Sequence, residues 1–279
     1  MSDIFLCSIC NVSSGSCAED CAYCTQSAKY NADIERYKFK PYSQILEEAR
    51  RASENGALGF CLVTSGRELD SKRLEYVAGA ARMIVESGLH LHLIGCSGIA
   101  SVESLKVLKE AGVASYNHNL EASANFFPKI CTTHSFKERY ETCENTLKAG
   151  LGLCCGGIFG MGESWQDRID LLYALQTLKP HTVPINFFIP NPALPLKQEI
   201  LSKEEALECV KLAREYLPNA RLMIAGGRER VFSDEQKELF DSGINAVVLG
   251  DYLTTKGNTP QLEVDRIKSY GYGIATSCE

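Results

Sequence analysis

The sequence predicts an α/β fold, and within that class a single-domain (β/α)8 barrel of the TIM type. Short runs rich in apolar and β-branched residues alternate with longer amphipathic stretches along the whole chain. Eight such pairs fill 279 residues, which matches the size and rhythm of a closed barrel. No linker, repeat or shift in composition marks a second domain, so residues 1–279 are expected to form one unit. An open doubly wound sheet is the alternative, because strand and helix pair loosely in the second and fourth units.

The predicted strands are short apolar segments enriched in β-branched and aromatic residues. In chain order they span residues 4–10, 58–64, 89–96, 113–120, 151–158, 182–189, 220–225 and 245–249. In a closed parallel barrel, the carboxyl ends of such strands carry the chemistry.

The predicted helices follow the strands and span residues 42–54, 71–87, 102–111, 136–149, 165–178, 203–216, 234–241 and 261–269. Ser202, with Glu205 three residues later, predicts a capping box before one of them. Glycines in left-handed conformation are expected to end helices or turns at Gly56, Gly88, Gly112, Gly150 and Gly243. The long connection of residues 11–40 is expected to be functional, since loops of that length are seldom idle.

Composition and charge exclude several classes of function. The chain is 45% hydrophobic and 23% charged, as in ordinary globular proteins, and its net charge of −6 argues against nucleic acid as a partner. No apolar run is long enough to span a membrane and no signal peptide is present, which predicts a cytoplasmic protein without a membrane partner. In that reducing compartment the 13 cysteines are expected to be thiols or metal ligands.

Three of these cysteines lie in the stretch GSCAEDCAYC, at Cys17, Cys21 and Cys24. The spacing C-x3-C-x2-C lets a short loop hold one face of an iron–sulfur cube and leave one iron open to a small molecule. A closed zinc site is an alternative, because Cys7 and Cys10 supply a further C-x2-C pair. A second alternative is a packed helical stripe, since the three positions would share one helix face.

The motif, with Tyr23 before its last cysteine, resembles the signature of the radical S-adenosylmethionine (SAM) superfamily. The stretches CAEDCAYCTQS, YNHNLE, CCGGIFGMGE, VPINFF, AGGRE and GDYLTT resemble the biotin synthase family in order and spacing, from residue 17 to about residue 255. This resemblance implies a (β/α)8 barrel and a 4Fe-4S cluster that binds SAM. It implies sulfur insertion into dethiobiotin to form biotin, a flavodoxin or ferredoxin as electron donor, and a homodimer.

The same resemblance implies an auxiliary 2Fe-2S cluster as the source of sulfur. Its implied ligands are Cys61, Cys96, Cys154 and Arg228. Residues on different strands can converge on the axis of a barrel, although a guanidinium is an unusual ligand because it has no free lone pair. Cys155 is expected to face the helices, since neighbouring strand residues alternate. Cys131, Cys143, Cys209 and Cys278 are expected to be ordinary core or surface thiols.

The segment YNHNLE predicts a row of polar side chains on one face of a strand, at Asn117, Asn119 and Glu121. Such a row is costly to bury without a polar ligand. By resemblance, the residues that bind SAM are Tyr23, Asn119, Glu121 and Arg139, although the family usually has aspartate at the position of Glu121. By resemblance, the residues that bind dethiobiotin are Asn117, Asn119, Asn186, Thr254 and Thr255. His118 lies between Asn117 and Asn119, so its side chain is expected to point to the opposite face of the strand, outside the barrel lumen.

Two other classes of function stay open. Another radical SAM barrel enzyme, such as a hydrogenase-maturation or mutase relative, would share the first cluster without needing the second set of ligands. A zinc or iron–sulfur protein without catalysis is the other alternative, and only metal content and SAM cleavage would separate it.

Overall fold

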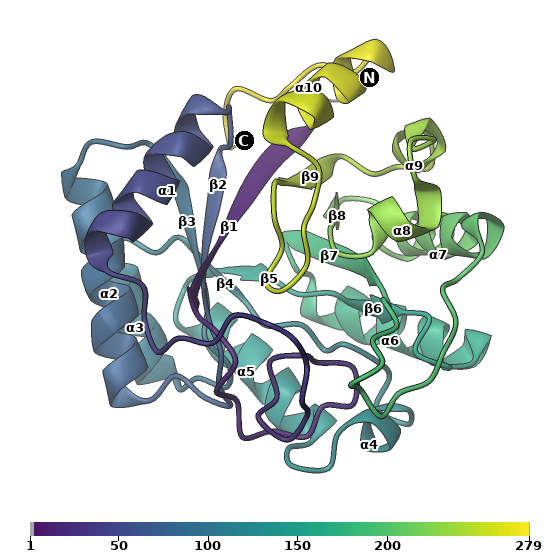
Figure 1. Cartoon of the computed structure of the whole chain (residues 1–279), viewed down its shortest axis with the longest axis horizontal. Coiled ribbons are helices and arrows are strands. Elements are labelled where there is room, and N and C mark those ends of the chain that lie inside the picture. The colour runs from purple at the N-terminus through teal and green to yellow at the C-terminus, as the bar shows by residue number, and fades with distance from the viewer. Residues whose placement is uncertain (1–2, 279) are drawn as a thin grey trace.

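A closed ring of parallel strands forms the centre of the molecule (Figure 1), as the sequence predicts. The computed structural model describes residues 3–278. The ring runs β1-β2-β3-β4-β5-β7-β8-β9 and returns to β1, closed by the pairing of Cys154 on β5 with Thr182 on β7. Every pairing in the ring is parallel, which requires a crossover between successive strands, and helices supply most of these.

All eight predicted strands are present, and one of them is divided in two. The strands are β1 (Phe5–Ser13), β2 (Gly59–Thr64), β3 (His92–Cys96), β4 (Ser115–Asn117), β5 (Gly152–Cys154), β6 (Gly157–Phe159), β7 (Thr182–Phe187), β8 (Arg221–Ile224) and β9 (Ala246–Leu249). The predicted strand of residues 151–158 is divided into β5 and β6. The break lies at Cys155 and Gly156, where the amide of Gly156 donates to Oδ1 of Asn119 (3.1 Å).

The predicted helices also form, with bounds that differ by a few residues at most ends. They are α1 (Tyr42–Glu54), α2 (Ser71–Glu86), α3 (Val102–Glu110), α5 (Phe136–Lys148), α6 (Trp165–Leu178), α7 (Lys203–Tyr216), α9 (Lys237–Asp241) and α10 (Pro260–Ser269). Two short helices were not predicted, α4 (Phe127–Ile130) and α8 (Arg228–Phe232). All five glycines expected to be left-handed have positive φ.

The predicted capping box at Ser202 is only half formed. The Ser202 side chain accepts a hydrogen bond from the amide of Glu205, as a helix cap does. The Glu205 carboxylate instead pairs with the buried guanidinium of Arg168 at 2.7 Å. A complete box occurs at α5, where Ser135 and Glu138 satisfy each other's backbone amides.

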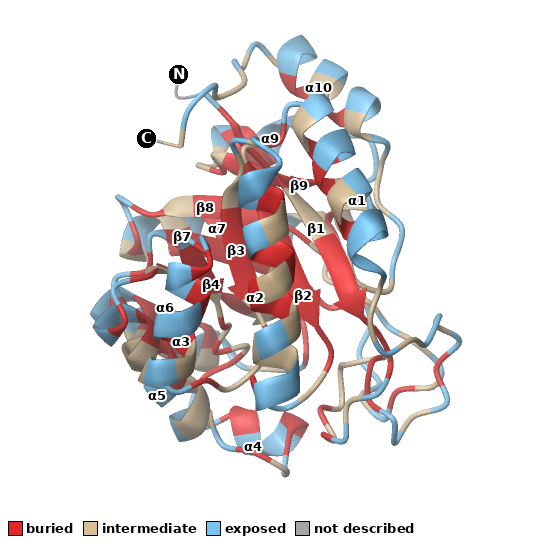
Figure 2. Ribbon diagram, turned by 90° about the vertical axis from the view of Figure 1, so that its left-hand side faces the viewer, coloured by how far each residue is buried: buried red, intermediate tan, exposed pale blue. Residues whose placement is uncertain are grey.

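The main hydrophobic core lies between the strands and the helices. Figure 2 shows the strands buried and the outer faces of the helices exposed. Ile45 of α1 and Leu105 and Leu108 of α3 are fully buried against the sheet. Burying each such side chain contributes about 1.5–3 kcal/mol, so these faces hold the helices against the barrel.

The connection between β1 and α1 crosses the carboxyl end of the barrel (Figure 1). Its residues contact segments far away in sequence: the amide of Ala22 donates to the carbonyl of Ile130 (2.8 Å), and the Thr25 and Thr254 hydroxyls lie 2.8 Å apart. This placement brings the predicted cysteine motif to the end of the barrel where parallel strands carry functional residues. Among residues 3–278, none of the helices has the length and apolar character to cross a membrane.

Candidate active site

A cavity of about 440 Å³ opens at the carboxyl end of the barrel. It is lined by side chains from the loop after β1, from the strand ends and from the loop after β9. The predicted site residues that line it are Cys17, Cys21, Tyr23, Cys24, Cys61, Cys96, Asn117, Asn119, Glu121, Arg139, Cys154, Asn186, Thr254 and Thr255. Tertiary structure therefore brings together all but one of the predicted site residues.

The cysteine loop, residues 15–28, is held by its own turns and is not a helix. The amide of Cys24 donates to the carbonyl of Cys21 (3.0 Å), and the amide of Ala28 donates to the carbonyl of Cys17 (2.7 Å). The interpretation of Cys17, Cys21 and Cys24 as a packed helical stripe is therefore wrong. Burial raises the pKa of the Cys24 thiol to about 11, so a metal would have to displace its proton.

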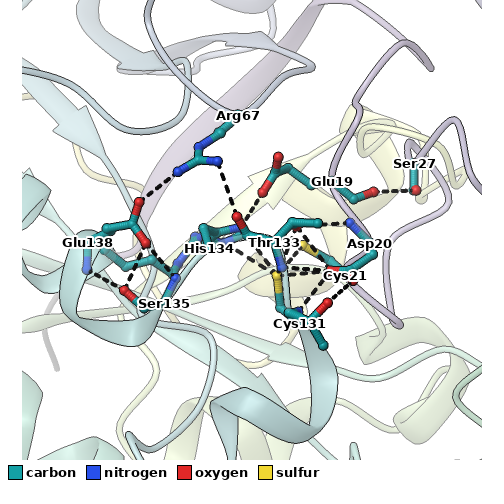
Figure 3. A network of polar contacts seen from close by, with 12 residues as sticks. Glu19, Asp20, Cys21, Ser27, Arg67, Cys131, Thr133, His134, Ser135 and Glu138 are labelled. Atoms are coloured by element: carbon teal, nitrogen blue, oxygen red, sulfur yellow. Dashed lines mark hydrogen bonds and ion pairs between the residues drawn. The ribbon is translucent and has the colours of Figure 1, made fainter.

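Cys131 and His134 lie directly beside Cys21, which the sequence did not predict (Figure 3). The Cys21 and Cys131 sulfurs are 3.6 Å apart, and Nδ1 of His134 lies 3.2 Å from the Cys131 sulfur. Their donor atoms all fall within 4.8 Å of one another, a spacing compatible with metal ligation. Cys131 is thus a buried core thiol, as expected, but one that contacts Cys21 and His134 at the edge of the site.

Glu19 and Arg139 fix the orientation of His134. The guanidinium of Arg139 can only donate, so Nε2 of His134, at 3.1 Å, must accept. Nδ1 then carries the proton toward the Glu19 carboxylate, 2.6 Å away. Glu19 is 7% exposed, so it is a buried partner of His134.

Asp20 ties the cysteine loop to the segment after α4. Its carboxylate accepts hydrogen bonds from the amides of Thr132 (2.9 Å) and Thr133 (3.2 Å) and from both threonine hydroxyls. Although burial raises it, these hydrogen bonds hold the pKa of Asp20 well below its usual value. The ionised form of Asp20 is therefore the one that docks the loop.

Asp20→Asn is expected to lower the free energy of unfolding by about 1–2 kcal/mol at neutral pH, after allowing for partial exposure to solvent. A carboxyl whose pKa is depressed by folding stabilises above its unfolded pKa and loses that effect as the pH falls through its folded pKa. The difference from the unaltered protein should therefore shrink as the pH falls below 3.8, the ordinary value. Urea unfolding from neutral pH to pH about 3 measures it.

Asp33→Asn is the matched control, because Asp33 is an exposed acid in the same connection. It should change stability little at any pH. A difference for Asp20→Asn that stays constant below pH 3.8 would show that ionised Asp20 does not dock the loop.

Cys61, Cys96 and Cys154 lie beneath the cysteine loop, and we call them the inner cysteines. The side chain of Asn117 bridges two of them: its Nδ2 donates to the Cys154 sulfur (3.1 Å), and its Oδ1 accepts from Cys96 (3.6 Å). A hydrogen bond with Cys96, together with burial, raises the pKa of Cys61 far above its usual value. Cys155 faces the opposite way and packs against Cys143 of α5 (3.6 Å), as strand alternation predicts.

Arg228 does not join the inner cysteines. Arg228 is not among the described residues that line the cavity. Arg228 begins α8 after the left-handed Gly227 and is fully buried, with Nη2 donating to Glu263 (2.9 Å) and to the carbonyl of Val248 (3.1 Å). Its guanidinium is thus committed to a carboxylate of α10, which corrects the prediction from resemblance.

Of the predicted polar row Asn117, Asn119 and Glu121, only Asn117 lies on strand β4. β4 ends at Asn117, and Glu121 has a left-handed φ of 68°, so period-two alternation fails beyond β4. As a result His118 also lines the cavity, contrary to expectation. Oε1 of Glu121 accepts from Arg139 (3.3 Å), while its buried Oε2 has no hydrogen-bond partner among residues 3–278. This leaves a carboxylate oxygen free to accept from a ligand.

Asn186 and the two threonines occupy the other side of the cavity. The Asn186 amide donates to the carbonyl of Gly157 (3.2 Å) and accepts from the amide of Gly226 (3.0 Å). It has one further donor and one further acceptor position for a ligand. Thr254 and Thr255 follow β9, and their loop reaches the cysteine loop through Thr25.

Comparison with known proteins identifies the family and supports the fold. Residues 11–175 match the family model of the Radical SAM superfamily, and residues 184–273 match the Biotin and Thiamin Synthesis associated domain. Among solved structures, the fold is similar to the FeFe-hydrogenase maturase HydG from Carboxydothermus hydrogenoformans (TM-score 0.83, 18% identity, covering 97% of this chain and 67% of that one). It is also similar to methylornithine synthase, PylB (TM-score 0.81, 18% identity, 98% and 84%). At this identity the two structures support the fold alone.

The barrel, the cysteine loop and the matched family model define a radical SAM enzyme. The chain is 68% identical over 278 residues to a biotin synthase of Wolinella succinogenes, covering 100% of both chains. It is 63% identical over 281 residues to a biotin synthase of Helicobacter pylori strain J99, again covering 100% of both. The chain belongs to the biotin synthase family.

Proposed function

We propose that this chain inserts sulfur into dethiobiotin to form biotin, using SAM as the source of a radical. The observation that carries the proposal is that two separate sets of thiols line one cavity. Cys17, Cys21 and Cys24 come from the cysteine loop, and the inner cysteines come from three strands beneath it. An enzyme that only cleaves SAM would need the first set alone.

The outer thiols fit a 4Fe-4S cluster, since three cysteines from one short loop offer soft ligands to three irons. When bound, this cluster with SAM would supply an organic radical able to remove hydrogen from an unactivated C–H bond. Arg139 would pair with the SAM carboxylate, and the free oxygen of Glu121 would accept from ribose hydroxyls. Tyr23 and Asn119 line the cavity beside them. The proposal includes a flavodoxin or ferredoxin as the electron donor of this cluster, and a homodimer as the assembly of the chain.

The inner cysteines fit a 2Fe-2S cluster that would supply the sulfur. Their thiols are buried or partly buried, and Asn117 can donate to sulfur, which is the kind of contact that tunes such clusters. Dethiobiotin would lie between the two sets. Asn117, Asn119 and Asn186 would meet its ureido ring, and Thr254 and Thr255 its carboxylate tail. The barrel walls hold the reacting groups close and exclude water.

Anaerobic reconstitution with iron and sulfide, followed by dethiobiotin, SAM and dithionite, tests the proposal with biotin detected by mass. Biotin formation is the expected result. SAM cleavage without biotin would favour another radical SAM enzyme. Absence of SAM cleavage would favour electron transfer, and a colourless protein that retains zinc would favour a structural metal site.

Cys154→Ala is expected to abolish biotin formation, because it removes a ligand of the sulfur source. SAM cleavage should persist, since the cysteine loop is unchanged. Comparing biotin with cleaved SAM in the same reaction measures this separation. Cys155→Ala is the matched control: Cys155 is adjacent and buried but packs toward α5, so both products should persist. Normal biotin formation by Cys154→Ala would contradict the assignment.

A further inference from the structure

The inner cysteines leave a 2Fe-2S cluster one ligand short. Such a cluster takes four ligands, most often four cysteine thiolates. Cys61, Cys96 and Cys154 supply three, and Arg228 is bound to Glu263 and Glu229 outside the cavity. The fourth ligand in this chain must therefore be another side chain near the inner cysteines.

Cys7 is a fourth thiol in the same cavity. It lies on β1, two residues before Ile9, which pairs with Cys61 of β2, so Cys7 points to the same inner face. It is 2% exposed and packs in one buried cluster with Cys61, against which Cys96 also packs. Among residues 3–278, its sulfur makes only one weak hydrogen bond, 3.8 Å to the carbonyl of Ser8, which leaves it able to take another partner.

The strand positions around Cys7 leave room for its sulfur. Cys7 pairs with Gly59 of β2, and a Cβ added to Gly59 would lie 3.0 Å from the Cys7 sulfur. On its other side Cys7 pairs with Val248 of β9, an apolar residue. The glycine therefore gives this thiol space that a larger residue would fill.

The other candidates fit less well. Met223 of β8 lines the cavity, but a thioether is a weaker ligand than a thiolate. Arg221 of β8 stacks on Phe5 at 3.9 Å and donates to the carbonyl of Cys278. The charge of Arg221 acts on both Cys7 and Cys154, so it can offset part of the negative charge of a four-thiolate site.

We propose that Cys7 is the fourth ligand of the inner cluster, in place of Arg228. This inference rests on the proposed function, because it presupposes an inner cluster. It makes the inner site an all-cysteine site on strands β1, β2, β3 and β5, with Arg221 nearby as a counter-charge.

The test is anaerobic reconstitution of the full chain with ⁵⁷Fe, followed by iron analysis, absorption and Mössbauer spectroscopy. The unaltered protein should bind about six irons per chain, four in the cube and two inside. Cys7→Ala should lower this to about four, or keep the inner pair with changed Mössbauer parameters, while the signal of the cube persists. Cys7→Ser, which preserves shape, should shift the absorption of the inner cluster if oxygen replaces sulfur.

Cys10→Ala is the control, because Cys10 is buried on the same strand but packs in the core toward the helices. It should keep six irons and unaltered spectra. If Cys7→Ala and Cys7→Ser both match the unaltered protein in iron content and spectra, Cys7 is not a ligand. An unaltered protein with four irons would overturn the inner cluster itself, and with it both this inference and the proposed source of sulfur.

Discussion

Gly156→Ala is expected to destabilise the protein by about 4 kcal/mol or more, the range of the most damaging single substitutions. A Cβ on Gly156 would lie 1.9 Å from the carbonyl oxygen of Pro184 on β7. The oxygen belongs to the backbone and the position of a Cβ is fixed by the backbone, so no side-chain rotation can relieve the overlap. The clash lies beside the pairing of Cys154 with Thr182, where β5 meets β7 and the barrel closes. Urea unfolding monitored by circular dichroism measures the loss.

Gly88→Ala is the control for this prediction. Gly88 has a φ of 78°, and an added Cβ would have no heavy atom within 4 Å. Its cost should be only the backbone strain of about 1–2 kcal/mol. A loss for Gly156→Ala no larger than that for Gly88→Ala would show that the backbone shifts enough to relieve the contact with Pro184.

Glu263→Leu is expected to cost about 3–5 kcal/mol, because it leaves the guanidinium of Arg228 buried without its main partner. Both side chains are 0% exposed, and their atoms are 2.9 Å apart. The double variant Arg228→Met with Glu263→Leu should recover most of the loss, since it leaves no buried charge from this pair unpaired. Urea unfolding of both single variants and the double variant gives the coupling energy.

The control is Glu141→Leu, which breaks the exposed pair of Lys137 and Glu141 (3.7 Å). It should change stability by less than about 1 kcal/mol. A loss for Glu263→Leu no larger than this would contradict a stabilising role of the buried pair. The double variant should also bind as much iron as the unaltered protein, and loss of two irons would instead identify Arg228 as a ligand.

Local sequence patterns were enough to predict the barrel. Short apolar runs located the strands, helical periodicity located the long helices, and glycines marked the turns that follow them. These features depend on contacts between near neighbours in the chain, so a window of the sequence contains their cause. The opposite directions of Cys154 and Cys155 follow from strand geometry in the same way.

The cysteine loop was also predictable as a candidate site, because its three thiols are only a few residues apart. Its neighbours were not. Cys131 and His134 reach Cys21 from more than 100 residues away, and nothing in the spacing of either segment indicates the other. The prediction that His118 points away from the lumen was wrong because β4 ends at Asn117. The alternation of side chains holds only while the backbone stays extended.

The sequence by itself determined the order of strands and helices and the presence of a three-thiol loop before the first helix. Only the tertiary structure decided which residues meet at the axis. Closing the ring placed Cys7 of β1 beside Cys61 of β2, and docking of α10 drew Arg228 toward Glu263 and away from the cavity. The physical reason is that secondary structure reflects local backbone preference, whereas the site depends on barrel closure and the pairing of a buried charge.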